Sequence, residues 1–235
     1  MTVTEIMADL QAHGSESIKT ILLKHGVKEP FFGVKIEHLK TIQKKVKKDY
    51  PLAKELYATG NADAMYLAGL VTDDTKMTKA DLQTWAEQAL SNNINEYTVP
   101  WVAAGSNYGF ELAMEWIDSE QDHIAAAGWS TLGNLSALKA DSELDMDTYR
   151  ALLTRVIENI HTAGNRVRSR MNIFVINVGC YITSLSNEAM AAAAQIGPVY
   201  VDTNGTSCKV PDAIDYINKV KDRGSLGKKK KTVKC

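Results

Sequence analysis

The sequence is poor in the residue patterns that build common catalytic and metal centres. Its three cysteines, Cys180, Cys208 and Cys235, are odd in number, widely spaced and form no CxxC pair. Neither a disulfide framework nor a zinc site is therefore expected. The five histidines are scattered, with no i, i+4 pairing and no adjacent carboxylate motif, and the chain has no glycine-rich phosphate loop and no Ser-His-Asp signature. We accordingly expect no metal site and no cofactor.

The sequence also lacks long hydrophobic runs. No apolar stretch approaches the length of a membrane span, and the first residues, MTVTEIMADLQAHG, lack the basic flank and apolar core of a signal peptide. Because reduced thiols fit the same picture, we expect a cytoplasmic protein without a membrane partner. The sequence does not indicate an oligomeric state.

The net charge of −1 conceals an uneven distribution. From Lys219 onward there are eight basic residues and one acidic residue, Asp222. Removing these from the totals of 27 basic and 28 acidic residues leaves 19 and 27, so residues 1–218 carry a formal charge of −8. An acidic body with a basic tail is typical of chains that contact a polyanion, although a lysine run also serves as a solubilising tail.

Apolar residues recur with helical periodicity along the whole chain. Ile36, Leu39, Ile42 and Val46, for example, form an apolar stripe on a helix whose other face is rich in lysine. Gly, Asn, Asp and Ser turns separate the later expected helices, which span about residues 98–117, 120–138, 145–162, 165–184, 186–196 and 210–223.

We predict an all-α fold. Grouping the helices in pairs gives a loose period that fits HEAT-like helical repeats in a solenoid, although an irregular helical bundle fits the same rhythm. A strand-like segment followed by an Asn-Gly turn permits a small hairpin at 198–207. Residues 1–223 are expected to form a single domain, with residues 224–235 as a basic C-terminal tail.

The central stretch Ser91–Gly105, SNNINEYTVPWVAAG, is the first candidate for a functional surface. Its asparagines and Pro100 predict that one helix ends near Leu90 and another begins near Thr98. Tyr97 and Trp101 would then lie near a helix N-terminus, which favours phosphate binding. Two aromatic rings at an anion site suit a nucleotide, whereas the alternative is that both rings pack between helices.

Two segments near the N-terminus resemble the opening of the AlkC/AlkD-like DNA alkylation repair family. These are the run from Phe32-Gly-Val34 through the basic helix to Val46, continued by Leu52–Tyr57, and the run Asn61-Ala-Asp-Ala-Met-Tyr-Leu-Ala-Gly-Leu70. The helical rhythm continues similarly to about Tyr181. The resemblance implies a HEAT-like solenoid whose concave face holds duplex DNA and, in the glycosylase branch, the release of a cationic alkylated purine.

The sequence departs from the glycosylase branch at the catalytic segment. That branch reads like N-W-D-x-x-D with the last aspartate catalytic, and alignment with Ile94–Trp101 places Tyr97 at the tryptophan and Trp101 at the aspartate. An indole cannot stabilise a developing positive charge on the sugar as a carboxylate does, or guide water. The catalytic residues are therefore unknown, and Glu96 is the candidate substitute carboxylate, with a surface glutamate as the alternative.

We predict a DNA-binding protein that contacts mainly the phosphate backbone, with glycosylase activity in doubt. The alternatives are a protein-interaction scaffold without nucleic-acid binding and an active alkylpurine glycosylase that uses a substitute carboxylate. The arginines of the segment 165–170 are candidates for DNA binding. Cations at a helix start oppose the helix dipole, so phosphate contact explains their presence better than helix stability does. The candidate DNA-binding residues are Tyr97, Trp101, Lys44, Lys45, Lys48, Arg166, Arg168, Arg170, Lys228, Lys229, Lys230 and Lys231.

Overall fold

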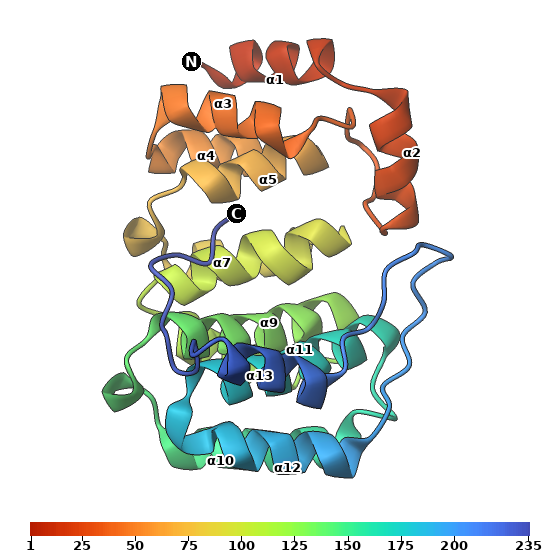
Figure 1. Cartoon of the computed structure of the whole chain (residues 1–235). Coiled ribbons are helices and arrows are strands. Elements are labelled where there is room, and N and C mark those ends of the chain that lie inside the picture. The colour runs from red at the N-terminus through yellow and green to blue at the C-terminus, as the bar shows by residue number, and fades with distance from the viewer. The chain divides into compact units, whose positions relative to one another are not determined.

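The computed structural model describes all 235 residues, and its regular secondary structure is entirely helical (Figure 1). Contacts group the residues into two compact units. Unit 1 comprises Met1–Tyr108 with Asn204–Thr206 and Lys234–Cys235, and unit 2 comprises Gly109–Thr203 with Ser207–Val233.

Unit 1 contains seven α-helices and two short helical turns. In chain order these are α1 (Val3–Ala12), α2 (Glu16–Lys24), α3 (Ile36–Val46), α4 (Tyr50–Ala58), α5 (Ala62–Val71), the 3₁₀ turn η1 (Asp74–Lys76), α6 (Lys79–Gln88), the π-helical turn η2 (Ile94–Thr98) and α7 (Val99–Gly105).

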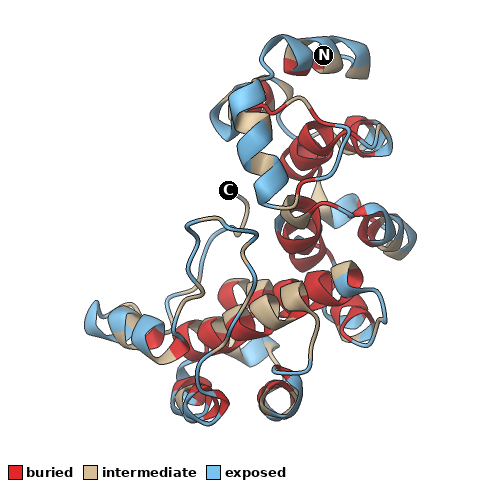
Figure 2. Cartoon of the chain, turned by 90° about the vertical axis from the view of Figure 1, so that its right-hand side faces the viewer, coloured by how far each residue is buried: buried red, intermediate tan, exposed pale blue.

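The core of unit 1 is organised around α5. All ten residues of α5 are buried, because small alanines let neighbouring helices approach it from every side (Figure 2). Asn61 starts the helix by accepting the N–H groups of Asp63 and Ala64. Beside it, the ring of Tyr57 stacks on Trp85 with centroids 4.0 Å apart and donates its hydroxyl to the Trp85 carbonyl.

The two N-terminal segments noted in the sequence are joined by a buried carboxylate. Asp63, at the start of α5, accepts the backbone N–H groups of Phe32, Gly33 and Val34 at 2.7, 3.0 and 3.3 Å. Gly33 has φ +78°, a conformation that a side chain disfavours. The contact between the two segments thus depends on both residues, the glycine for its backbone conformation and the aspartate for its acceptor oxygens.

Unit 2 contains six α-helices and two 3₁₀ turns. They are α8 (Gly109–Trp116), α9 (Asp122–Leu138), η3 (Asp141–Glu143), α10 (Met146–Asn159), α11 (Asn165–Tyr181), η4 (Thr183–Leu185), α12 (Ser186–Ile196) and α13 (Ala213–Asp222). The 17-residue helices α9 and α11 pack on each other at its centre. Trp129, Tyr149 and Phe174 meet there in edge-to-face and stacked contacts. Trp85, Trp116 and Trp129 are all buried, as expected for core residues.

The structure corrects two expectations about secondary structure. The helix expected over 98–117 is broken into α7 and α8, because the Ser106 hydroxyl donates to the Ala103 carbonyl and accepts the Tyr108 N–H. The hairpin allowed at 198–207 does not form, and this segment contains no strand. Its backbone groups at Tyr200 and Asp202 bond instead to side chains of α11.

Candidate functional site

The stretch Ser91–Gly105 is almost continuously helical. After α6 ends at Gln88, the π turn η2 runs directly into α7, so there is no separate helix start near Thr98. The wider turn has a local cause, because Pro100 lacks the N–H that would bond to the Glu96 carbonyl in an α-helix. The expected phosphate site at a helix N-terminus therefore has no structural basis here.

The aromatic residues of this stretch differ in their exposure. Trp101 is 6% exposed and packs edge-on against Tyr66, with ring centroids 5.4 Å apart. Tyr97 is 43% exposed and lies against Trp101 with its ring tilted by 55°. The indole ring of Trp101 is therefore buried and packs against the ring of Tyr97. Of the two, only Tyr97 has a ring that a ligand can reach.

Glu96, the candidate substitute carboxylate, is buried at 3% exposure in the π turn. Its neighbour Asn95 is also buried and donates its amide to the Ala89 carbonyl, which ties the turn to the end of α6. The other two glutamates near this stretch, Glu111 and Glu115, are exposed on α8 in unit 2. No carboxylate of the segment 91–105 is both exposed and beside Tyr97.

The candidate lysines of unit 1 lie at and after the end of α3. Lys44 and Lys45 are exposed in its last turn, where cations also stabilise the negative end of the helix dipole. Lys48 has 72% of its side chain exposed and lies 3.7 Å from Asp73. The three lysines are thus exposed to solvent close to the C-terminal end of α3.

Arg168 of α11 is fully engaged by the protein backbone. Its guanidinium donates to the carbonyls of Ile160, Ala163 and Tyr200 at 3.2, 2.9 and 3.0 Å. The first two carbonyls belong to the end of α10 and the turn after it, so Arg168 satisfies acceptors that a helix end leaves open. Its positive charge is unfavourable at the N-terminus of α11, but it is favourable at the C-terminus of α10, whose carbonyls it binds. These contacts account for an arginine at this position without a bound phosphate.

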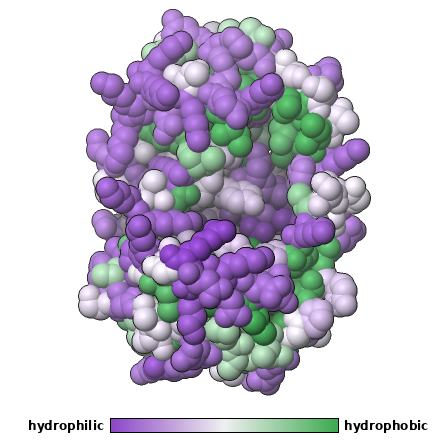
Figure 3. Space-filling model, in the orientation of Figure 1, coloured by the Kyte–Doolittle hydropathy of each residue, from purple (hydrophilic) through white to green (hydrophobic).

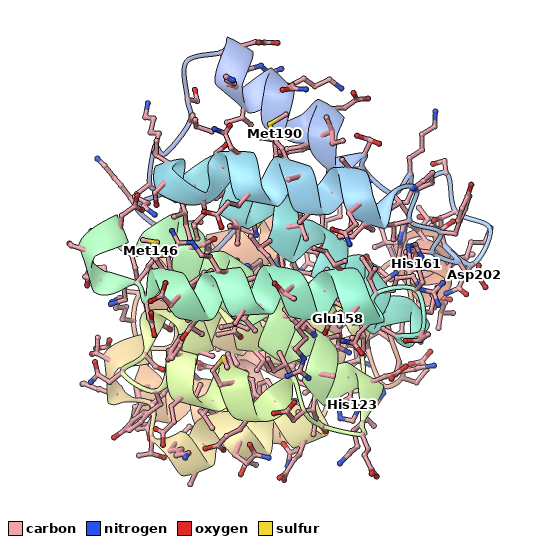
Figure 4. The ribbon with its side chains drawn as sticks, turned by 90° about the horizontal axis from the view of Figure 1, so that it is seen from below. His123, Met146, Glu158, His161, Met190 and Asp202 are labelled. Carbon is pink, nitrogen blue, oxygen red and sulfur yellow. The ribbon has the colours of Figure 1, made fainter.

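Arg168 also helps to hold the segment 198–203 against α11. Asn165 forms a reciprocal pair with Asp202, in which its amide donates to the Asp202 carbonyl and its oxygen accepts the Asp202 N–H. Figure 4 shows Asp202 near His161, which bonds the Ile196 carbonyl. Tyr200 is 77% exposed between these anchors, the largest exposure of any large hydrophobic residue in the chain. The anchored segment therefore presents an aromatic ring to solvent.

The other two arginines of α11 are partly buried. Arg166 and Arg170 flank Arg168 at alternate positions in the first turns of the helix, and the Arg170 guanidinium donates to the Ser169 hydroxyl at 2.9 Å. All three arginines at the start of α11 are therefore partly buried.

The lysines of the C-terminal segment divide between protein contacts and solvent. Lys229 pairs with Asp141 at 2.7 Å and donates to the Ser136 carbonyl, and Lys230 lies 5.3 Å from the ring centroid of Tyr181. Lys228, Lys230 and Lys231 are exposed. Within unit 1, Lys234 pairs with Asp74 at 2.6 Å, and burial lowers the pKa of Lys234 while it raises that of Asp74. Several of these cations thus belong to the protein's own packing.

Comparison with known proteins identifies the family. A family model for the DNA alkylation repair enzymes matches residues 6–217. The chain belongs to the DNA alkylation repair enzyme family.

Two relatives of this family member come from Listeria. The uncharacterized protein Lin0241 of Listeria innocua is 32% identical over 229 residues, and the uncharacterized protein Lmo0209 of Listeria monocytogenes is 31% identical. Each alignment covers 95% of this chain and 99% of the relative.

One solved structure matches the family member along its full length. The solved protein represents a new family of proteins related to the HEAT-like repeat DNA glycosylases with affinity for branched DNA structures. The TM-score is 0.91, the sequence identity is 34%, and the match covers 100% of both chains. The predicted all-α, HEAT-like repeat fold is confirmed. None of the α-helices combines the length and the apolar character that a membrane span requires.

The structure brings together side chains that the sequence analysis treated separately. Asp9 and His13 of the N-terminal region meet His38 of α3 within 4.8 Å. The expectation that no histidine has an adjacent carboxylate motif is wrong here, and the i, i+4 spacing of Asp9 and His13 was the available signal. Tyr200 was missed for a different reason, because an exposed tyrosine in a loop has no sequence pattern of its own.

Proposed function

We propose that this protein binds branched DNA, mainly through the phosphate backbone, and does not excise alkylated bases. The observation that carries the proposal is the full-length match to a solved structure whose family has affinity for branched DNA. The identity of 34% and the TM-score of 0.91 over the whole of both chains mean that the two proteins have the same fold.

The exposed cations support a backbone-directed mode of binding. Lys44 and Lys45 in unit 1, and Lys228 and Lys231 in unit 2, are exposed. Lysine is a point charge that neutralises phosphate without reading base edges. Figure 3 shows that hydrophilic side chains cover most of the face it presents. Such contacts recognise where phosphates lie in space, which is what distinguishes a junction from a linear duplex.

The exposed aromatic residues complement these cations. Tyr200 and Tyr97 each present a ring to solvent, at 77% and 43% exposure. Stacking on a base requires that the base be accessible, which is the case at a branch point more than inside a duplex. We assign Tyr97 and Tyr200 as candidate contacts to unpaired or partly unstacked bases.

The proposal against base excision depends on the catalytic position. By the resemblance described above, Trp101 falls where the glycosylase branch has its aspartate, and the indole is buried against Tyr66. Glu96 is 3% exposed, and a carboxylate acts on a nucleoside only when it can reach the sugar. The expected result of incubation with DNA that contains 3- or 7-alkylpurines is no release of free base. Release that Glu96→Gln abolishes would instead establish a substitute carboxylate.

A salt titration tests the binding mode. Affinity for a four-way junction should fall steeply as salt rises, since each phosphate contact contributes about 0.9 to the slope of log K against log salt. Lys228→Gln with Lys231→Gln should lower that slope by about 2. Point variants are better than deletion of residues 224–235, because deletion also removes Lys229 and Lys234 from their protein contacts. Affinity indifferent to salt would contradict the proposal.

The second candidate function is a protein-interaction scaffold. It is favoured by the formal charge of −8 on residues 1–218 and by an apolar groove of about 690 Å³ in unit 1, between α2 and α3. Ile21 and Ile36 line this groove and are 50% and 41% exposed. If junction DNA does not bind at low salt, this groove becomes the principal functional surface.

A further inference from the structure

The N-terminal helix and α3 meet through one carboxylate and two imidazoles. Asp9 Oδ1 lies 2.9 Å from His13 Nδ1, and Asp9 Oδ2 lies 3.3 Å from His38 Nε2. Asp9 is in α1, His13 is the residue after the last turn of that helix, and His38 is in the first turn of α3. The polar contact therefore joins two helices that are separate in the chain, and Figure 1 shows α1 next to α3.

We propose that Asp9, His13 and His38 form a binding site for a Zn²⁺-type divalent ion. Two imidazoles and one carboxylate are a ligand set that zinc uses in three-ligand sites, with water in the fourth position. The three ligand atoms all lie within 4.8 Å of one another. Atoms bound to one tetrahedral zinc at 2.0–2.2 Å lie about 3.4 Å apart, so the existing cluster needs to contract by little more than an ångström.

The ring geometry specifies which side chain moves. The rings of His13 and His38 are stacked, with centroids 3.7 Å apart and planes inclined by 19°. A metal ion lies in the plane of each imidazole that binds it, and two nearly parallel planes do not meet at such a point. One ring must turn, and His13 has the room because 51% of its side chain is exposed. In turning, its Nδ1 exchanges the 2.8 Å hydrogen bond to the Asp9 carbonyl for the ion. Asp9 and His38, each 23% exposed, form the fixed part of the site.

The position of the site assigns the ion a structural role. α1 is held to the rest of unit 1 by two fully buried side chains, Ile6 and Leu10. An ion shared by Asp9, His13 and His38 would add a cross-link between α1 and α3, the helix that carries Lys44 and Lys45. None of the three residues lines the groove between α2 and α3, so the ion stabilises the N-terminal helix pair.

The test uses the full-length, tag-free protein after dialysis against a chelator. Co²⁺ and Zn²⁺ are titrated into the wild type and into Asp9→Asn, His13→Ala and His38→Ala. Visible absorption of four-coordinate Co²⁺ and calorimetry with Zn²⁺ report binding, and hydrogen exchange of residues 3–13 reports the structural effect. His25→Ala is the matched histidine control. Cys208→Ser with Cys235→Ser removes the two exposed thiols that could bind zinc elsewhere.

We expect about one ion per chain, affinity lowered tenfold or more in each cluster variant, and slower exchange in α1 when the ion is bound. The histidine control and the thiol variant should bind as the wild type does. The proposal is overturned if the cluster variants bind as tightly as the wild type, if the thiol variant loses binding, or if the wild type binds no ion. Melting temperatures without metal show that the variants are folded.

Discussion

Replacing Asp63 with alanine tests the tertiary contact that joins the two segments typical of the family. The carboxylate accepts three backbone N–H groups, from Phe32, Gly33 and Val34. Alanine leaves these donors without an acceptor in a place where water has little access, since Gly33 and Val34 are buried. A buried donor without a partner costs about 1–3 kcal/mol.

The expected loss of stability follows from the bond geometry. The Phe32 bond is short but its residue is partly exposed, and the Val34 bond is long at 3.3 Å. We therefore count two unsatisfied donors, and add a few tenths of a kcal/mol for the loss of an acidic residue in the first turn of α5. Asp63→Ala should then lower the free energy of unfolding by about 3–5 kcal/mol. Urea denaturation followed by circular dichroism measures this value.

Two controls separate the contact from the helix position. Asp63→Asn retains one acceptor oxygen and should lower the free energy of unfolding by about half as much as Asp63→Ala does. Asp147→Ala removes an acidic residue from the first turn of α10, where its side chain is 94% exposed, and should cost less than about 1 kcal/mol. A loss below about 1 kcal/mol for Asp63→Ala would refute the account of the contact.

Three further predictions concern separate parts of the molecule. Lys44→Gln with Lys45→Gln should weaken junction binding and lower its salt slope by about 2, while Lys40→Gln, a partly buried lysine of the same helix, should have a smaller effect; equal effects would remove α3 from the interface. Burial tends to raise the pKa of Asp81, but hydrogen bonds from Lys54, Tyr50 and Thr78 outweigh it and hold that pKa well below its ordinary value. The charged carboxylate therefore stabilises the fold above the unfolded pKa of about 3.9, and this stability is lost as pH falls below about 4. Asp81→Asn should lower the melting temperature at pH 7 and differ less from the wild type below pH 4; a difference independent of pH would contradict this. Arg168→Ala should speed amide exchange in residues 199–203 and cost about 1–3 kcal/mol, whereas the exposed Arg223→Ala should do neither; unchanged exchange would show that Asn165 alone anchors the segment.

The helices could be predicted from the sequence because their cause is local. Apolar periodicity and capping residues placed α9, α10 and α12 within a few residues of their observed bounds. The break between α7 and α8 was missed because it depends on two hydrogen bonds of Ser106. The hairpin was wrong because side chains more than thirty residues away, Asn165 and Arg168, take the backbone groups that an opposing strand would use.

The candidate site was less predictable because charge and aromatic content do not reveal exposure. Trp101 and Tyr97 are equally plausible ligands in the sequence, and only packing against Tyr66 distinguishes them. Lys228 and Lys229 are neighbours in one lysine run, yet the second is paired with Asp141. Family membership was accessible from the sequence, because the segments that begin at Phe32 and Asn61 resemble the opening of this family.

The central claim is a preference for branched over linear DNA. It is tested most directly by competition for the protein between a fluorescent four-way junction and an unlabelled linear duplex with the same sequence and number of phosphates, at about physiological ionic strength, where exposed charges are screened within about 8 Å. We predict that the junction binds at least about tenfold more tightly, a difference of about 1.4 kcal/mol. Equal affinity for the two, or no affinity for either, would contradict the account.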